Sequence, residues 1–253
     1  MVAGLAFLFF ITALLYASVG FGGGSTYNAL LVLHGADYRI LPAIALICNI
    51  IVVSGGAWRF SRAGHLNWRA LFPWLAASVP AAWMGGRLAI SETVFVGALG
   101  FSLLIAGAHL LMERDRALTD KVAPTPPAFA FIIGGAIGFL AGLVGIGGGI
   151  FLAPVLYFLH WGRPREIAGA CSLFILVNSI SGLAGQLMKL ESLNVTGQIT
   201  DYWLVFPAVL IGGQIGSRFS SATLSPKAIK RLTAILILYV SVRLIFRWVA
   251  LIT

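Results

Sequence analysis

Charged residues are scarce in this chain, and their scarcity excludes a soluble globular protein. Only 10% of the 253 residues are Asp, Glu, Lys or Arg, whereas 59% are hydrophobic. A soluble domain carries about a quarter charged residues because its surface faces water. The apolar residues fall in blocks near the ~20 residues that cross a hydrocarbon core, without the period-two alternation of a transmembrane barrel. The sequence therefore predicts an all-α polytopic membrane protein.

Cysteines and acidic residues are also few, which argues against metal-binding and catalytic sites. Cys48 and Cys171 both lie inside apolar segments, so we expect neither a disulfide framework nor a metal site. The eight acidic residues fall at loops or segment ends, and the four histidines lack the close spacing of metal ligands. We therefore expect a protein that is not an enzyme, with no catalytic residues, no metal and no cofactor.

The formal net charge of +9 comes from seventeen Lys and Arg residues that lie mostly in short segments between the apolar blocks. In a membrane protein, such cations set the orientation through the excess of positive charge in cytoplasmic loops. We therefore expect the lipid bilayer, and no nucleic acid, as the partner of this charge.

A repeated glycine motif divides the chain into two related halves. Residues 16–34 read YASVGFGGGSTYNALLVLH and residues 141–160 read AGLVGIGGGIFLAPVLYFLH. Further along, Asn49 corresponds to Asn178, and Gly56 corresponds to Gly185. The sequence thus predicts a first transmembrane repeat over 1–113, a cytoplasmic linker over the charged, Pro-rich 114–127, and a second repeat over 128–253.

Each half is expected to contain one short helix between longer ones. The predicted helices are 3–19, 25–34, 41–57, 70–88 and 93–112, then 128–144, 150–160, 166–187, 202–219 and 228–250. The segment after the glycines has about ten residues and rises about 15 Å, roughly half a bilayer. It either continues the opening helix, giving four crossings per half, or folds back as a re-entrant hairpin, leaving three crossings.

The distribution of Lys and Arg favours the hairpin. That arrangement gathers twelve of the seventeen cations on one face and leaves five on the other, namely Arg39, Arg87, Lys189, Arg243 and Arg247. Four crossings per half would give no such bias. The richer face should be cytoplasmic, with both termini outside. Three crossings is an odd number, so the fold class we predict is two inverted repeats, each a glycine-broken re-entrant hairpin plus three transmembrane helices.

The glycine breaks are the candidate binding site. A helix that restarts after a break begins with free N–H groups and the positive end of its dipole, which together favour an anion. Substrate-binding candidates are Gly22, Gly23, Gly24, Ser25, Asn49, Gly147, Gly148, Gly149 and Asn178. Additional candidates are Thr26, Asn28, Gln186, Gln214, Arg87 and Arg218. Gly134, Gly138 and Gly142, in contrast, form a small-residue row typical of helix packing.

The repeated V-G-[FI]-G-G-G, together with S-L-F-I-L-V-N-S-I-S-G at 172–182 and the length of the chain, resembles the sulfite exporter TauE/SafE family of membrane permeases. The resemblance covers essentially the whole chain and is plainest at 139–187. It implies movement of sulfur-containing anions, such as sulfite or organosulfonates like sulfoacetate, across the bacterial inner membrane. It implies no catalysis.

Two alternatives to a carrier stay open at this point: a passive anion channel and a membrane-embedded structural subunit. Inverted repeats favour a carrier that works by alternating access. Coupling to a proton or another cation and assembly as a homodimer are both compatible with the sequence, which specifies neither.

Overall fold

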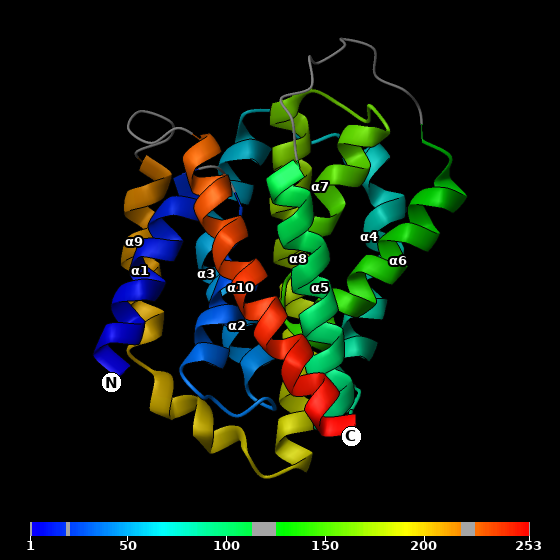
Figure 1. Cartoon of the computed structure of the whole chain (residues 1–253). Coiled ribbons are helices and arrows are strands. Elements are labelled where there is room, and N and C mark those ends of the chain that lie inside the picture. The colour runs from blue at the N-terminus through cyan, green and yellow to red at the C-terminus, as the bar shows by residue number, and fades with distance from the viewer. Residues whose placement is uncertain (1, 19–20, 113–124, 219–225, 253) are drawn as a thin grey trace.

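The computed structural model describes residues 2–18, 21–112, 125–218 and 226–252. These residues form a bundle of long and short helices with no strand among them (Figure 1). In the first half lie α1 (Val2–Ser18), α2 (Gly24–Leu33), α3 (Leu41–Arg62), α4 (Trp68–Arg87) and α5 (Glu92–Met112). In the second lie α6 (Pro127–Val144), α7 (Gly149–Phe158), α8 (Pro164–Ser192), the 3₁₀-helix η1 (Thr196–Tyr202), α9 (Val205–Arg218) and α10 (Pro226–Ile252).

Local sequence signals set several of these boundaries. α6 and α8 begin at prolines, whose fixed φ and missing N–H suit the first helical position. Asn67 caps α4 by accepting a hydrogen bond from the Ala70 backbone N–H. α6 ends at Gly145, which adopts a left-handed φ of +77°. All ten expected helices are present, and the structure adds η1.

The chain reverses direction at the first glycine break. The rings of Phe9 in α1 and Tyr27 in α2 stack with centroids 4.8 Å apart. One turn nearer the break, a Cβ on Gly23 would lie 3.1 Å from the Thr12 methyl carbon. If α2 continued α1, the eighteen residues between Phe9 and Tyr27 would separate these rings by about 27 Å. α1 and α2 therefore form an antiparallel hairpin.

The second glycine break reverses the chain in the same way. A Cβ on Gly148, at the start of α7, would lie 3.0 Å from a methyl carbon of Ile137 and 3.2 Å from the Ala141 side chain. Gly148 thus lies beside the last turns of α6 rather than beyond them. α6 and α7 form a second hairpin, and its tip meets that of the first hairpin inside the bundle.

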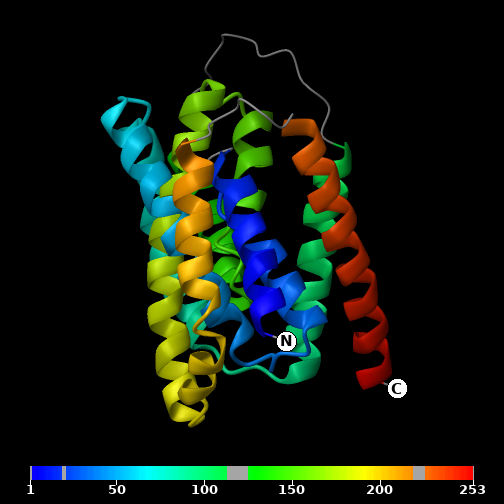
Figure 2. The same ribbon diagram turned by 90° about the vertical axis from the view of Figure 1, so that its left-hand side faces the viewer.

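Each hairpin packs mainly against a helix from the other half of the chain. Gly134 and Gly138 of α6 approach Trp74 and Ser78 of α4 so closely that a Cβ would come within 2.6 Å of backbone atoms. On the other side of the bundle, Gly212 and Gly216 of α9 lie against Phe10 and Leu14 of α1 in the same way. Figure 2 shows α1 and α9 side by side, and α5 beside α10. Because residue numbers rise together in both pairs, α4 and α6 run parallel, as do α1 and α9.

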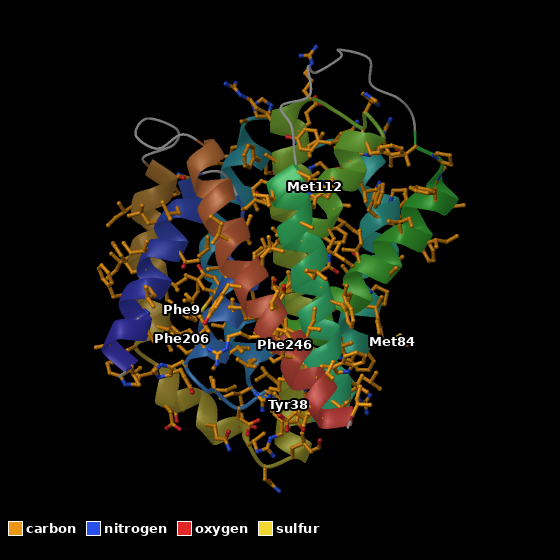
Figure 3. All side chains as sticks on the ribbon, viewed as in Figure 1. Phe9, Tyr38, Met84, Met112, Phe206 and Phe246 are labelled. Atoms are coloured by element: carbon orange, nitrogen blue, oxygen red, sulfur yellow. The ribbon has the colours of Figure 1, made fainter. Side chains whose placement is uncertain are left out.

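The outer surface of the bundle is apolar. Large hydrophobic side chains such as Met84, Met112 and Phe246 point outward, whereas Phe9 is fully buried (Figure 3). In water such a surface would be unstable, but in lipid it is the expected exterior. The structure is therefore that of a polytopic membrane protein.

Four helices are long and apolar enough to cross a membrane by length and composition: Leu41–Arg62, Glu92–His109, Pro127–Val144 and Arg165–Ser192. Three of them match expected crossings, and the fourth is the opening arm of the second hairpin. α9 has only fourteen residues, and α4 contains two prolines. These four helices are counted among the described residues alone, and several side chains of α10 are not among those residues. The expected linker at 114–127 also lies largely outside the described residues.

Candidate functional site

The two hairpin tips meet around the side chain of Asn49, which projects from α3 and is fully buried. The Gly23 backbone N–H donates to Asn49 Oδ1 at 3.3 Å, and Asn49 Nδ2 donates to the Ile146 carbonyl at 3.3 Å. A Cβ on Gly24 would lie 2.6 Å from both Asn49 Nδ2 and the Ile146 oxygen. The tips are thus in direct contact, and one amide bridges them.

The carbonyl groups at the end of α6 are capped by amide side chains from two other helices. Gln186 Nε2 in α8 donates to the Gly142 carbonyl at 2.7 Å. Asn28 Nδ2 in α2 donates to the Val144 carbonyl at 2.8 Å. Asn49 bonds to the carbonyl of Ile146, just beyond the end of the helix. These donors offset the partial negative charge that the end of a helix carries.

The Gly23 N–H at the beginning of α2 is bonded to Asn49 Oδ1, whereas no side-chain cap is found at the beginning of α7 among the described residues. The N-cap residues of α2 and α7 are Gly23 and Gly148, which have no side chain to cap the first turn. Gly147 and Gly148 have φ of +82° and +81°, a region in which side chains larger than hydrogen are strained. The positive ends of two short helices therefore lie in the protein interior without a cap from their own N-cap residues, while the negative end of α6 is capped by Asn28 and Gln186. This imbalance favours an anion.

Several polar atoms near the tips are buried without a hydrogen-bond partner among the described residues. They are the Tyr27 hydroxyl, the Ser179 hydroxyl, and the side-chain oxygens of Asn28, Asn178 and Gln186. Ser179 lies closest to a glycine break, because its Oγ is 3.2 Å from the position of a Cβ on Gly147. Leaving such a group unpaired costs roughly 1–3 kcal/mol. A bound ligand would reduce that cost.

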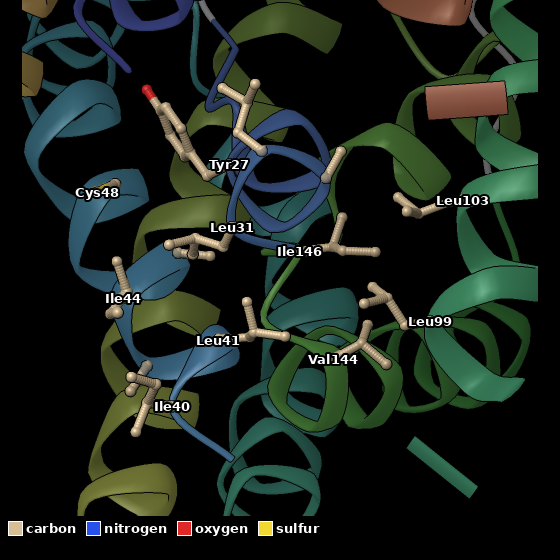
Figure 4. Packing of buried hydrophobic residues seen from close by; sticks show 14 of the residues in the cluster. Tyr27, Leu31, Ile40, Leu41, Ile44, Cys48, Leu99, Leu103, Val144 and Ile146 are labelled. Carbon is tan, nitrogen blue, oxygen red and sulfur yellow. The ribbon is translucent and has the colours of Figure 1, made fainter. Parts of the chain in front are cut away.

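Figure 4 shows part of the buried hydrophobic cluster to which Ile146 of the second break belongs. Tyr27 and Leu31 of α2, Cys48 of α3 and Leu99 of α5 are members of the same cluster. These side chains are buried, and Gly22–Thr26 and Gly145–Gly149 are buried too. The tips are closed off from both ends of the bundle in this conformation.

The structure brings together most of the residues predicted from sequence, but not all of them. Gly22, Gly24 and Gly147 lie within reach of Asn49, and a Cβ on Gly149 would contact Ile175. Asn28 and Gln186 bond to the end of α6, as described above. Ser25 is buried in the first turn of α2, and its neighbour Thr26 is buried and shares a 2.9 Å hydrogen bond with Tyr16.

Other predicted residues lie apart from the tips or take a different role. Asn178 donates to its own Phe174 carbonyl at 2.8 Å, so it does not bridge the tips as Asn49 does. Arg87 is exposed and stacks on Trp83, and Gln214 is exposed on α9. Arg218 ends α9, and its side chain is not among those described.

Sequence reasoning missed Ser179 and Tyr27. Both stand next to residues or motifs that were singled out, since Ser179 follows Asn178 and Tyr27 follows Thr26. Ser179 could have been placed on the face of its helix that carries Ser172, because the two are seven residues apart, whereas no such spacing marks Tyr27. Among the described residues, no group of three His, Cys, Asp or Glu side chains is arranged to hold a metal ion.

An all-helical bundle with an apolar exterior and a buried polar centre at two helix breaks defines a polytopic membrane protein with an internal site. Within that class, the chain belongs to the family described as "Sulfite exporter TauE/SafE", whose model matches residues 5–244. It is accordingly a membrane transporter of this family.

The names of similar proteins agree with this assignment. The chain is 34% identical over 246 residues to "Probable membrane transporter protein y4hK" of Sinorhizobium fredii, covering 96% of this chain and 98% of the relative. It is 26% identical to "Probable membrane transporter protein YjnA" of Bacillus subtilis, covering 89% and 92%. A probable membrane transporter protein of Methanocaldococcus jannaschii is 28% identical, covering 70% and 69%. No solved structure matches.

Proposed function

We propose that this protein is a secondary transporter that moves a small sulfur-containing anion, such as sulfite or an organosulfonate like sulfoacetate, across the bacterial inner membrane. The anion binds between the two glycine tips. The backbone N–H groups that begin α2 and α7 donate to it, together with Asn49 and the Ser179 hydroxyl. That the substrate contains sulfur is inferred from the family to which the chain belongs. That the substrate is an anion is inferred from the arrangement of helix ends at the site.

One observation carries the proposal of an anion site. At the meeting point of the tips, Asn28 and Gln186 cap the carbonyl end of α6, and Asn49 bonds to the carbonyl of Ile146 just beyond it, while the N-cap residues of α2 and α7 are glycines without a side chain. No acidic side chain appears among the buried polar residues of the described part of the chain. An anion can therefore be held by backbone dipoles without strong repulsion.

The proposed mechanism is alternating access between inverted repeats. It is supported by the exchange of packing partners, in which α1 packs on α9 while α6 packs on α4. These pairs correspond to each other when the halves are superposed in sequence. If the unit that contains α1 and α9 rocks against the unit that contains α4 and α6, the buried tips would open to one side of the membrane at a time.

The proposed orientation has the basic loops in the cytoplasm and both termini outside. Ser61 and Ser192 are exposed near opposite ends of the bundle, whereas Cys48 and Cys171 are buried. In a variant with both native cysteines replaced by alanine, we expect Ser61→Cys to react with a membrane-impermeant maleimide only in lysed cells. Ser192→Cys should react in intact cells. The reverse pattern would overturn this orientation.

Two other functions compete with a carrier. A passive anion channel needs a continuous path, whereas the tips here touch each other and are buried. A structural subunit would need no buried polar centre at all. Both features favour the carrier.

The function is tested with the purified protein in liposomes. We expect saturable, counterflow-stimulated uptake of labelled sulfite or sulfoacetate, with sulfate as a comparison anion. Running the assay with and without a pH gradient shows whether protons drive transport. Non-saturable flux would indicate a channel instead. Absence of flux for every sulfur anion, from folded protein, would refute the proposed substrate class.

A further inference from the structure

Lys189 is the one charged residue among the buried side chains of the described part of the chain, with 9% of its surface exposed. It lies in α8, one turn before the helix ends at Ser192. Within the residues described, no hydrogen bond or ion pair satisfies its ammonium group. The side chain is largely enclosed, although the ammonium nitrogen is not among the fully enclosed polar atoms that lack a partner, and a cation held this deep in a membrane protein is a functional feature by default.

The acidic residues at the same end of the bundle do not neutralise it. Asp37 is bonded by Arg39, with Nη2 and Oδ2 2.5 Å apart, and Glu92 is bonded by Arg247. Glu191 and Asp201 are exposed. The positive charge of Lys189 is thus uncompensated.

Lys189 is more enclosed by protein than the other described cations near helix ends. A lysine near a helix end normally extends its charged head to the interface and exposes it. Arg87 and Arg243, which also lie in the final turns of their helices or near them, are both exposed. Lys189 instead keeps only 9% of its surface exposed, although its helix reaches the same end of the bundle as the beginning of α1 (Figure 1).

Lys189 belongs to a row of buried residues that leads back to the glycine tips. Counting toward the tips along α8, Gln186, Gly182 and Ser179 follow at helical spacings of three or four residues, and all are buried. Gln186 bonds to the end of α6, and the Ser179 hydroxyl lies beside Gly147. The row spans about 15 Å, since ten residues rise 1.5 Å each.

We propose that Lys189 forms a second, outer anion site. The transported oxyanion passes through it between the tips and the end of the bundle at which α8 terminates at Ser192. The ammonium donates to an oxygen of the anion. The unpartnered Oε1 of Gln186, one turn closer to the tips, accepts a hydrogen bond from the acidic proton of the anion or from its hydrating water. This inference rests on the proposed function, because the outer anion site belongs to the same transport path as the site between the tips.

The test compares Lys189→Gln and Lys189→Arg with Arg243→Gln, which removes one positive charge from an exposed site near the same end. Each variant is reconstituted in one orientation, and the KM for labelled sulfite is measured from each side. A unit charge a few ångströms away should change affinity about tenfold or more. We expect Lys189→Gln to raise the KM at least tenfold when sulfite is supplied on the side of the membrane where α8 terminates at Ser192. The KM measured from the other side should rise less. Lys189→Arg and Arg243→Gln should stay within about threefold of the parent protein.

Equal KM values for Lys189→Gln and the parent protein would overturn the outer site. A change that Arg243→Gln reproduces would also overturn it, because surface potential would then suffice. Removing a buried charge should not destabilise the fold, so misfolding of both Lys189→Gln and Lys189→Met would assign the residue a structural role and refute the proposal. If the parent protein moves no sulfur anion, the proposed function itself fails, which is a distinct result.

Discussion

Replacing Gly24 with alanine is expected to reduce anion flux about a hundredfold, the effect of ångström-scale misplacement of groups that hold a substrate. A Cβ at this position would lie 2.6 Å from the Ile146 carbonyl oxygen and from Asn49 Nδ2. The first of these atoms belongs to the backbone of the opposite tip and cannot rotate away. The two tips must therefore separate, and the bridge through Asn49 must break. Flux in proteoliposomes measures the loss, and the thermal midpoint of the purified protein checks that it remains folded.

Two matched variants make this result specific. Gly4→Ala adds the same methyl group to α1, where no atom lies within 4 Å, and should leave flux unchanged. In Gly149→Ala, the new methyl group would contact the flexible side chain of Ile175 rather than the backbone of the other tip. The loss of anion flux should therefore be smaller than in Gly24→Ala. Full transport by Gly24→Ala would remove the contact between the tips from the mechanism.

Replacing Gly138 with leucine should destabilise the fold more than any change at the tips. A Cβ on Gly138 would lie 2.6 Å from Ser78 Cα in α4, so even the first carbon of a side chain forces α4 and α6 apart. Overpacking a tight interface costs about 3 kcal/mol, which for a chain of this length lowers the thermal midpoint by roughly 10 °C. Thermal unfolding of the detergent-solubilised protein, followed by size-exclusion chromatography, measures the shift.

Gly135→Leu is the control for this substitution. Gly135 lies in the same helix, but a Cβ there would meet only the Ala77 side chain, at an ordinary 3.5 Å. The thermal midpoint should therefore change by about 2 °C or less. Equal losses at both positions would mean that a larger side chain anywhere on this part of α6, rather than the approach of α4, explains the effect, since helix propensity favours leucine over glycine.

Much of the fold could be predicted because its main signals are local. The glycine runs break helices wherever they occur, and the short segments after them cannot cross a bilayer. The correspondence of the halves then pointed to Asn49 as a residue of the site. Asn178 occupies the matching position but bonds to its own helix, because correspondence in sequence does not fix a side-chain rotamer.

The rest could not be predicted, because it depends on long-range contacts or on how far a helix extends. The bond from Asn28 to Val144 joins residues 116 apart, and nothing local specifies it. The sequence placed Lys189 in a loop, because the helix before it was predicted to end at residue 187. The structure continues α8 to Ser192, so the lysine is enclosed by protein instead of solvent.

The exchange of packing partners also has a consequence for how the chain is made. Phe10 in α1 packs against Gly212 in α9, which is synthesised about 200 residues later. At 5–20 residues per second, the ribosome needs roughly 10–40 s to make the intervening chain. Throughout that interval, a helix face shaped to receive a glycine has no partner within the nascent chain. The first half alone therefore cannot reach its final structure, and the insertion machinery or lipid must shield it until α9 arrives. The two halves are duplicated in sequence, yet they complete their folding only as a single cooperative unit.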